Sequence, residues 1–339
     1  MKNNCNIFIG GGFTDSQILW ISKIISGYEK KPKEIVLEQK YNVITMNDFK
    51  KTFPDSEICI ENETHKNFFD KFFFIILNLK KLFYFLFKLK KKKSFINSFQ
   101  SQVVNSIWDT ALNSMNDSQL KPTIYQKIVA ILKSLGAIKK AKKILNLYDV
   151  KLVFLGHSVY GARAMLTYFR KKKIKIFCQA GFNVHDCSQR ESAWNQISLP
   201  LFNEMEKKIK KKYIFSYWKK RLLGRANYFD AQVASNIQNK IAKYPKNVIF
   251  LHIFKDSPFN YLDEKRIFYD YFDWITKTLK ILRSSKEMWA LRTHPNASRW
   301  GEDQKKIIEN LLINEPDIKK KIFIDENSVS NNFVFKNVN

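Results

Sequence analysis

Several features that would narrow the protein's class are scarce or missing in this sequence. Its four cysteines (Cys5, Cys59, Cys178 and Cys187) form no CxxC pair and no zinc-ligand spacing, which is typical of a reducing compartment. Residues 1–12 lack a basic stretch followed by a long apolar run, so we expect no signal peptide. The apolar run that starts at Phe72 is broken by Asn78, Lys80 and Lys81, and is shorter than the ~20 residues that span a bilayer.

Acidic residues are also few. The chain has 31 Asp and Glu against 59 Lys and Arg, which gives a net charge of +28. One explanation is a polyanionic partner, such as nucleic acid, anionic lipid or a phosphorylated substrate. The other is a coding bias toward Lys, Asn, Ile and Phe. We expect no specific nucleic-acid partner, because no nucleic-acid-binding motif is present and the aromatic residues follow core patterns.

The apolar segments of residues 1–243 predict an α/β domain, since strand and helix patterns alternate. Expected strands are Cys5–Ile9, Ile35–Leu37, Asn42–Thr45, Val150–Leu155 and Lys175–Gln179. Expected helices are Thr14–Ser26, Tyr160–Arg170, most of Ser98–Leu147 and most of Ser192–Asn236. The order from Val150 to Gln179 predicts a βαβ unit of a parallel sheet, and residues of about 64–147 form a helical insertion.

A second α/β pattern follows the boundary at Tyr244–Asn247. Expected strands are Val248–Ile253, Met288–Arg292 and Lys321–Ile324, and expected helices are Glu264–Arg283 and Glu302–Leu312. We therefore predict two doubly wound, Rossmann-like domains, 1–243 and 244–339, of which the second is short.

Phe68–Lys93 predicts an unusually apolar helix with lysines at one end. It fits a helix that lies in the interface of an anionic membrane. It equally fits a helix that covers the core or a domain partner.

A glycine turn follows the first expected strand. Backbone N–H groups of Gly11 and Gly12 could bind an anion at the start of the next helix. The spacing is not G-x-G-x-x-G, and no acidic residue marks the end of a second strand. A tight turn explains the glycines equally well. Asp15 is either a helix cap or a general base.

His157 and Ser158 follow the strand Val150–Leu155, at a sheet edge where α/β proteins bind ligands. Ser158 suggests a serine hydrolase, but G-x-S-x-x-G is one residue longer than a nucleophile elbow. Ser158 is otherwise a helix N-cap. His157 is a second candidate base, ahead of His185 and Asp186.

Two strand ends of the second domain carry the remaining candidates. His252 is followed by a turn with Asp256 and Ser257. Arg292 and His294 alternate along the next strand, and Pro295 ends it. A rigidly held imidazole with Asn296 beside it could donate to a phosphate oxygen and stabilise a nucleotide leaving group.

The order of these segments resembles a known family. FLHIFKDSP, DYFDWITKTLKIL and WALRTHPNASRWGED, together with GHSVYGARAMLTYFRKKKIKIF, are similar to the bacterial capsule and surface polysaccharide glycosyltransferases that carry a His-Pro motif and relate to Kdo transferases. The resemblance covers about half of the chain. It implies a GT-B fold, with the acceptor on the first domain and the nucleotide sugar on the second.

The resemblance further implies transfer of a sugar from a nucleotide-activated donor, with CMP as one candidate nucleotide, to a glycan or lipid-linked glycan, with no cofactor and no bound metal. His294 would contact the donor phosphate. In the family the second domain continues past the strand KIFID, so we expect an incomplete donor site here, in either a fragment or a truncated, inactive protein. The expected location is cytoplasmic, at the inner membrane surface. The alternative function is a non-catalytic membrane-surface or scaffold protein.

Overall fold

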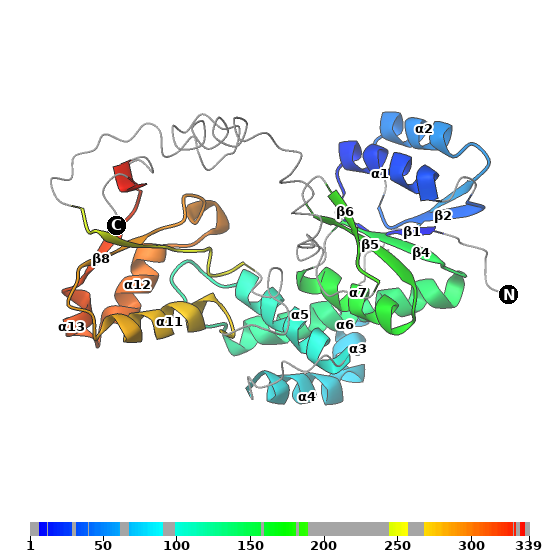
Figure 1. Ribbon diagram of the computed structural model, residues 1–339. Coiled ribbons are helices and arrows are strands. Elements are labelled where there is room, and N and C mark those ends of the chain that lie inside the picture. Colours follow the sequence, from blue (N-terminus) through cyan, green and yellow to red (C-terminus); the bar gives the residue numbers. More distant parts are fainter. Residues whose placement is uncertain are drawn as a thin grey trace. The chain divides into compact units, whose positions relative to one another are not determined.

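Figure 1 shows the structure, a computed structural model. It describes residues 7–11, 13–28, 32–39, 41–61, 68–90, 99–156, 159–180, 183–188, 244–256, 268–327, 329 and 333–335. They form two compact units. The first holds the described residues up to 111 and from 123 to 188, and the second holds 112–122, 244–256 and those from 268 onward.

The first unit is built on a six-stranded sheet in the order β3-β2-β1-β4-β5-β6. The strands are β1 (Ile7–Ile9), β2 (Glu34–Leu37), β3 (Glu57–Ile60), β4 (Leu152–Leu155), β5 (Lys175–Ala180) and β6 (Asn183–Asp186). β1 to β5 are parallel, and β6 pairs antiparallel with β5. The order reverses between β1 and β4, so the unit is α/β and compatible with a Rossmann-like fold.

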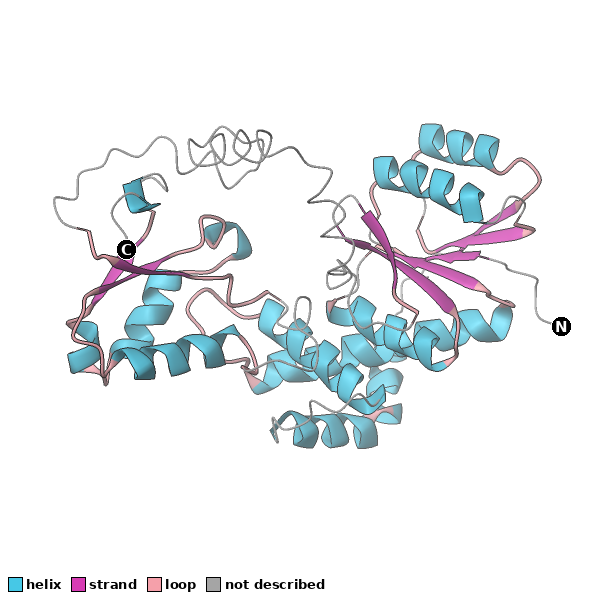
Figure 2. Cartoon of the chain, in the orientation of Figure 1, coloured by secondary structure: helices cyan, strands magenta, loops and turns pink. Residues whose placement is uncertain are grey.

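Helices cover both faces of this sheet (Figure 2). Ile7 and Ile9 of β1 point toward α1 (Asp15–Tyr28) and α2 (Val43–Thr52), where they join Ile18, Ile21 and other apolar residues. Phe8 points to the opposite face, in the same core as residues of α6 (Ile124–Leu147) and α7 (Tyr160–Lys171). The alternation of side chains along a strand thus makes two cores from one sheet.

Three further helices lie between β3 and α6 in the sequence: α3 (Phe68–Leu77), α4 (Leu79–Lys90) and α5 (Phe99–Asn113). α4 packs against α6. No helix among the described residues combines the length and the apolar character that crossing a bilayer requires.

The second unit has a three-stranded parallel sheet in the order β7-β8-β9. Its strands are β7 (Asn247–Phe250), β8 (Trp289–Arg292) and β9 (Ile322–Asp325). α11 (Tyr271–Leu282) connects β7 to β8, and α12 (Gln304–Leu312) and α13 (Pro316–Lys319) connect β8 to β9. This unit is therefore also α/β.

Most expected elements are confirmed, including the βαβ unit β4-α7-β5. The strand expected at Asn42–Thr45 is wrong, because Asn42 caps α2 by accepting a hydrogen bond from the Thr45 N–H. The helix expected from Glu264 begins later, at Tyr271, where Asp270 caps it. The prediction at Ser192–Asn236 lies outside the described residues.

Replacing Phe8 by Ala tests the core of the first unit. The ring is fully buried and lies 6.0 Å from the ring of Phe169, measured between centroids. We expect the free energy of unfolding to fall by about 3–5 kcal/mol, measured by urea denaturation. Val43→Ala, at an exposed position of α2, should leave it nearly unchanged; similar losses in both variants would contradict this packing.

Candidate functional site

The carboxyl ends of the parallel strands in the second unit bring two predicted residues, His252 and His294, together. His252 follows β7, His294 follows β8, and Asn327 follows β9. The ring centroids of His252 and His294 are 6.1 Å apart. Open α/β sheets bind ligands at this edge, because the loops there leave backbone and side-chain polar groups facing outward.

The His294 ring is held in one tautomer by its own loop. The backbone N–H of Asn296 donates to Nδ1 of His294 at 3.1 Å. Since Nδ1 accepts, a neutral His294 carries its proton on Nε2. The ring lines a cleft of about 510 Å³, together with Asp117, Thr293 and residues of the 295–305 loop. The donor atom of a neutral His294 ring is therefore Nε2.

His252 is held by stacking. Its ring lies against Tyr271 with centroids 4.3 Å apart and planes 11° apart. Nδ1 lies 3.1 Å from the carbonyl oxygen of Ile253. The two histidines are thus fixed by different partners, His252 by a ring and His294 by a backbone amide.

Gln304 joins the two strand ends through its carboxamide. Its Oε1 accepts from the His294 N–H at 2.7 Å, and its Nε2 donates to the carbonyl oxygen of His252 at 2.9 Å. The side chain is 2% exposed. Both histidine backbones therefore depend on one buried amide, which sequence reasoning missed because Gln304 looks like an ordinary first residue of a helix.

Glu302 organises the loop after β7 in the same way. Its carboxylate accepts from the N–H of Phe254 at 3.0 Å, from the N–H of Lys255, and from Nε2 of Gln304 at 3.0 Å. Burial raises the pKa of Glu302 above its ordinary value, and these donors oppose the shift. Glu302 is thus an anchor for the loop that carries His252.

Lys255 ties the same loop to two other segments of the second unit. Its ammonium donates to the carbonyl oxygens of Met115, at 2.9 Å, and Gly301. Burial lowers the pKa of Lys255, while Glu302 and Asp117 oppose that change. Gly301 has a φ of +62°, and a Cβ there would lie 3.1 Å from Oδ1 of Asp117, so glycine is favoured at this turn.

The acidic residues that line the cleft have partners within the unit. Glu302 binds the loop amides, Asp303 caps α12 by accepting from the Lys306 N–H at 2.9 Å, and Glu326 pairs with Lys305 at 2.7 Å. Asp117 is electrostatically coupled to Lys255. These contacts hold the acidic residues in place but do not remove their charge, and among the described residues four acidic side chains and one lysine, Lys305, line the cleft.

Arg292 does not have the position expected of a phosphate ligand. Its guanidinium is 2% exposed, pairs with Asp325 and donates to the carbonyl oxygen of Val329 at 2.9 Å. Tyr244 donates to the same carboxylate at 2.7 Å, and burial raises the pKa of its hydroxyl. Since β8 turns Arg292 into the interior, we reassign it from binding phosphate to holding β8 and β9 together.

Asn296 and Asp256 also differ from their expected positions. Asn296 orients His294 through its backbone, as described above. The backbone N–H of Asp256 donates to the Ile253 carbonyl at 3.2 Å, which closes the turn after β7. Neither is among the described residues that line the cleft.

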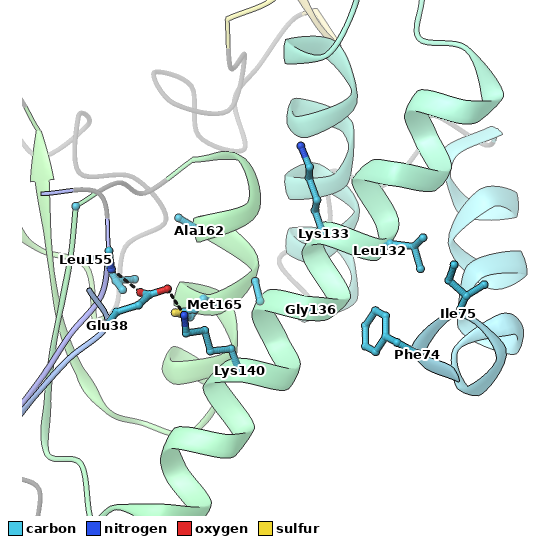
Figure 3. A pocket seen from close by; sticks show the side chains of 13 residues that line it. Glu38, Phe74, Ile75, Leu132, Lys133, Gly136, Lys140, Leu155, Ala162 and Met165 are labelled. Atoms are coloured by element: carbon cyan, nitrogen blue, oxygen red, sulfur yellow. Dashed lines mark hydrogen bonds and ion pairs between the residues drawn. The ribbon is translucent and has the colours of Figure 1, made fainter. Parts of the chain in front are cut away.

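The first unit has its own cavity, of about 700 Å³, at the carboxyl ends of β1, β2 and β4 (Figure 3). Glu38 directly follows β2, which corrects the expectation that no acidic residue marks the end of a second strand. Its carboxylate accepts from the Gly11 N–H and pairs with Lys140 of α6 at 2.5 Å. The glycine turn therefore holds a carboxylate of the protein itself.

Gly10 explains why this turn is glycine-rich. Its N–H donates to the Phe154 carbonyl at 2.8 Å, and a Cβ there would lie 2.6 Å from Cδ2 of Leu155.

Asp15 is the first residue of α1, and its carboxylate accepts from the Asn42 N–H at 3.1 Å. Thr14 accepts the capping bond from the Gln17 N–H at 3.3 Å, so Asp15 links α1 to the start of α2.

Four predicted site residues lie outside the described residues: Gly12, His157, Ser158 and Ser257. Within the described part of the chain, no group of three His, Cys, Asp or Glu side chains is arranged to hold a metal ion.

Comparison with protein-family models, curated proteins and solved structures found no match to this chain.

Replacing Gln304 by Ala tests the connection between the two histidine loops. The His294 N–H and the His252 carbonyl would lose their partner inside the unit, so we expect the free energy of unfolding to fall by about 1–3 kcal/mol. Urea denaturation measures the loss, and Lys305→Ala, an exposed neighbour, is the control. An unchanged Gln304→Ala variant would show that the amide is dispensable.

The Arg292–Asp325 pair makes a second prediction. Asp325→Leu should cost about 3–5 kcal/mol because it leaves a buried guanidinium without its counter-ion. The double variant Arg292→Met, Asp325→Leu should recover much of that stability. If denaturation shows the double variant to be less stable than Asp325→Leu alone, the assigned role is wrong.

Proposed function

We propose that this chain belongs to the GT-B type of glycosyltransferase and moves a sugar from a nucleotide-activated donor to a glycan acceptor. The observation that carries the proposal is His294, held at the carboxyl edge of a parallel sheet with Nδ1 accepting from the Asn296 amide. The presence of two α/β units is in keeping with the GT-B architecture, and the His-Pro segment is the one in which the family resemblance is centred.

The role proposed for His294 is to bind the phosphate that leaves with the nucleotide. When the bond between sugar and phosphate breaks, negative charge grows on the departing oxygen. A donor already oriented toward that oxygen stabilises the transition state without further reorganisation. In a neutral imidazole the Nε2 proton supplies such a hydrogen bond, and the buried Gln304 and Glu302 contacts keep the loop in position.

The cavity of the first unit is proposed to bind the acceptor. Glu38 and Lys140 place a carboxylate and an ammonium on a wall that is otherwise largely apolar, which suits a ligand with a polar head and an apolar body. A base is needed to take the proton of the acceptor hydroxyl. Asp15 and His157 remain the candidates from the sequence, and Glu38 is added to them because it lines the cavity.

Nucleotide binding by His294→Ala tests the donor site. Loss of one hydrogen bond to a charged group should weaken binding by about 10- to 100-fold. Isothermal titration calorimetry with CMP, CDP and UDP on the full chain would measure the effect. His294→Gln, which keeps a donor near the position of Nε2, should lose less.

Asn310→Ala, on α12 and not among the residues that line the cleft, is the control and should bind like the unaltered chain. The proposed role of His294 is wrong if the unaltered chain binds a nucleotide and His294→Ala binds it equally well.

A further inference from the structure

The helices α3 and α4 expose an unusual amount of apolar surface. Leu77 is 76% exposed and Phe83 is 68% exposed. The other large apolar side chains that are exposed on this pair are Phe72, Phe73, Ile75, Ile76, Leu79, Tyr84 and Phe87. So many exposed large apolar side chains on two consecutive helices point to an interaction surface, because exposing them to water is unfavourable. We define these side chains as the α3–α4 face.

A break at Asn78 separates the two helices. The Asn78 side chain donates to the Phe74 carbonyl at 2.8 Å and accepts from Nζ of Lys81 at 3.3 Å. The helices have 10 and 12 residues, and a bilayer span needs ~20. An apolar helix pair this short suits the surface of a bilayer and not its interior.

Lysines accompany the apolar side chains on α4. Lys80, Tyr84 and Lys88 follow one another at intervals of four residues, so they form one stripe beside Phe83 and Phe87. Both lysines are exposed, and the ammonium of Lys88 lies over the Tyr84 ring, 5.6 Å from its centroid. Aromatic side chains beside lysines are typical of helices that bind the head-group region of anionic lipids.

A basic groove of about 490 Å³ lies beside α4, and Lys80 and Tyr84 of the same stripe line it. Its walls include Phe85 and Leu135, and four lysines border it: Lys80, Lys81, Lys142 and Lys171. None of the described residues that line it is acidic. The ammonium of Lys171 lies over the Phe99 ring, 4.6 Å from its centroid. Apolar walls with a cationic border match a phospholipid, which has acyl chains and a phosphate.

The charge of the chain favours a bilayer over a second copy as the occupant of this face. A symmetric dimer through the α3–α4 face would bring the lysines of both copies into one interface, since the same surface is used twice. The whole chain carries a net charge of +28, so approach of two copies is repulsive. An anionic surface reverses the sign of that interaction.

We propose that the α3–α4 face docks on an anionic lipid bilayer, with its aromatic side chains in the interface and its lysines on the lipid phosphates. The basic groove beside α4 then receives the head group of a lipid. This docking is independent of the proposed sugar transfer and would place the apolar-walled cavity of the first unit, to which α3 contributes Phe74 and Ile75, near the lipid surface.

Vesicle flotation of the full chain tests the proposal. We expect binding to vesicles of phosphatidylcholine with phosphatidylglycerol, weaker binding in high salt, and little binding to phosphatidylcholine alone. Lys80→Glu with Lys88→Glu should lower the partition coefficient by roughly 10- to 100-fold. The control is Lys23→Glu with Lys50→Glu, which changes the net charge equally on α1 and α2, across the sheet from α4.

Substitutions of exposed apolar side chains test the hydrophobic contribution to membrane binding. Phe73→Gln with Leu77→Gln, and Phe83→Gln with Phe87→Gln, should each weaken binding by about tenfold or more. Val43→Gln with Ile44→Gln, exposed on α2, should have no effect. Circular dichroism confirms that each variant is folded.

Three results would overturn the proposal: equal binding to both kinds of vesicle, equal effects of the control and test variants, or no binding by the unaltered chain. A fourth is a dimer in analytical ultracentrifugation that the Phe83 and Phe87 variant dissociates, since a second copy would then cover the face.

Discussion

The buried carboxamide of Gln304 is the contact on which the candidate site depends. It joins the backbones of His252 and His294, which are 42 residues apart in the numbering, and it shares a hydrogen bond with Glu302. Glu302 in turn holds the 254–255 amides, and Lys255 holds the turn at Gly301. Buried polar groups of this kind are favourable only when every donor and acceptor is paired. Loss of one of these hydrogen bonds is therefore expected to destabilise all the loops that the network joins.

Contacts within the same unit also fix the orientation of the His294 imidazole. The Asn296 amide selects the His294 tautomer, and the Arg292–Asp325 pair holds the strands that carry the loop. The acidic residues of the cleft interact with amides and lysines of the same unit. If His294 binds a phosphate as proposed, little of the binding free energy is spent on ordering its side chain.

Much of the fold could be predicted from sequence, because strands such as Val150–Leu155 and helices such as Tyr160–Arg170 have strong apolar patterns. Short polar elements were harder to predict from the sequence. Asn42–Thr45 contains three β-branched residues, which favour a strand, but Asn42 caps a helix, and local capping outweighs a four-residue pattern. The positions of His252 and His294 at strand ends were predictable, whereas the burial of Arg292 and the roles of Glu302 and Gln304 depend on partners far away in the chain.

The central claim is that His294 offers its Nε2–H to a nucleotide phosphate. Imidazole ¹⁵N spectra of the full chain, recorded with and without CMP or UDP, test it most directly. The structure predicts the Nε2–H tautomer in the neutral ring, and the proposal predicts that its Nε2 resonance moves when nucleotide binds. An Nδ1–H tautomer, or a resonance that stays in place while nucleotide binds, would contradict the claim.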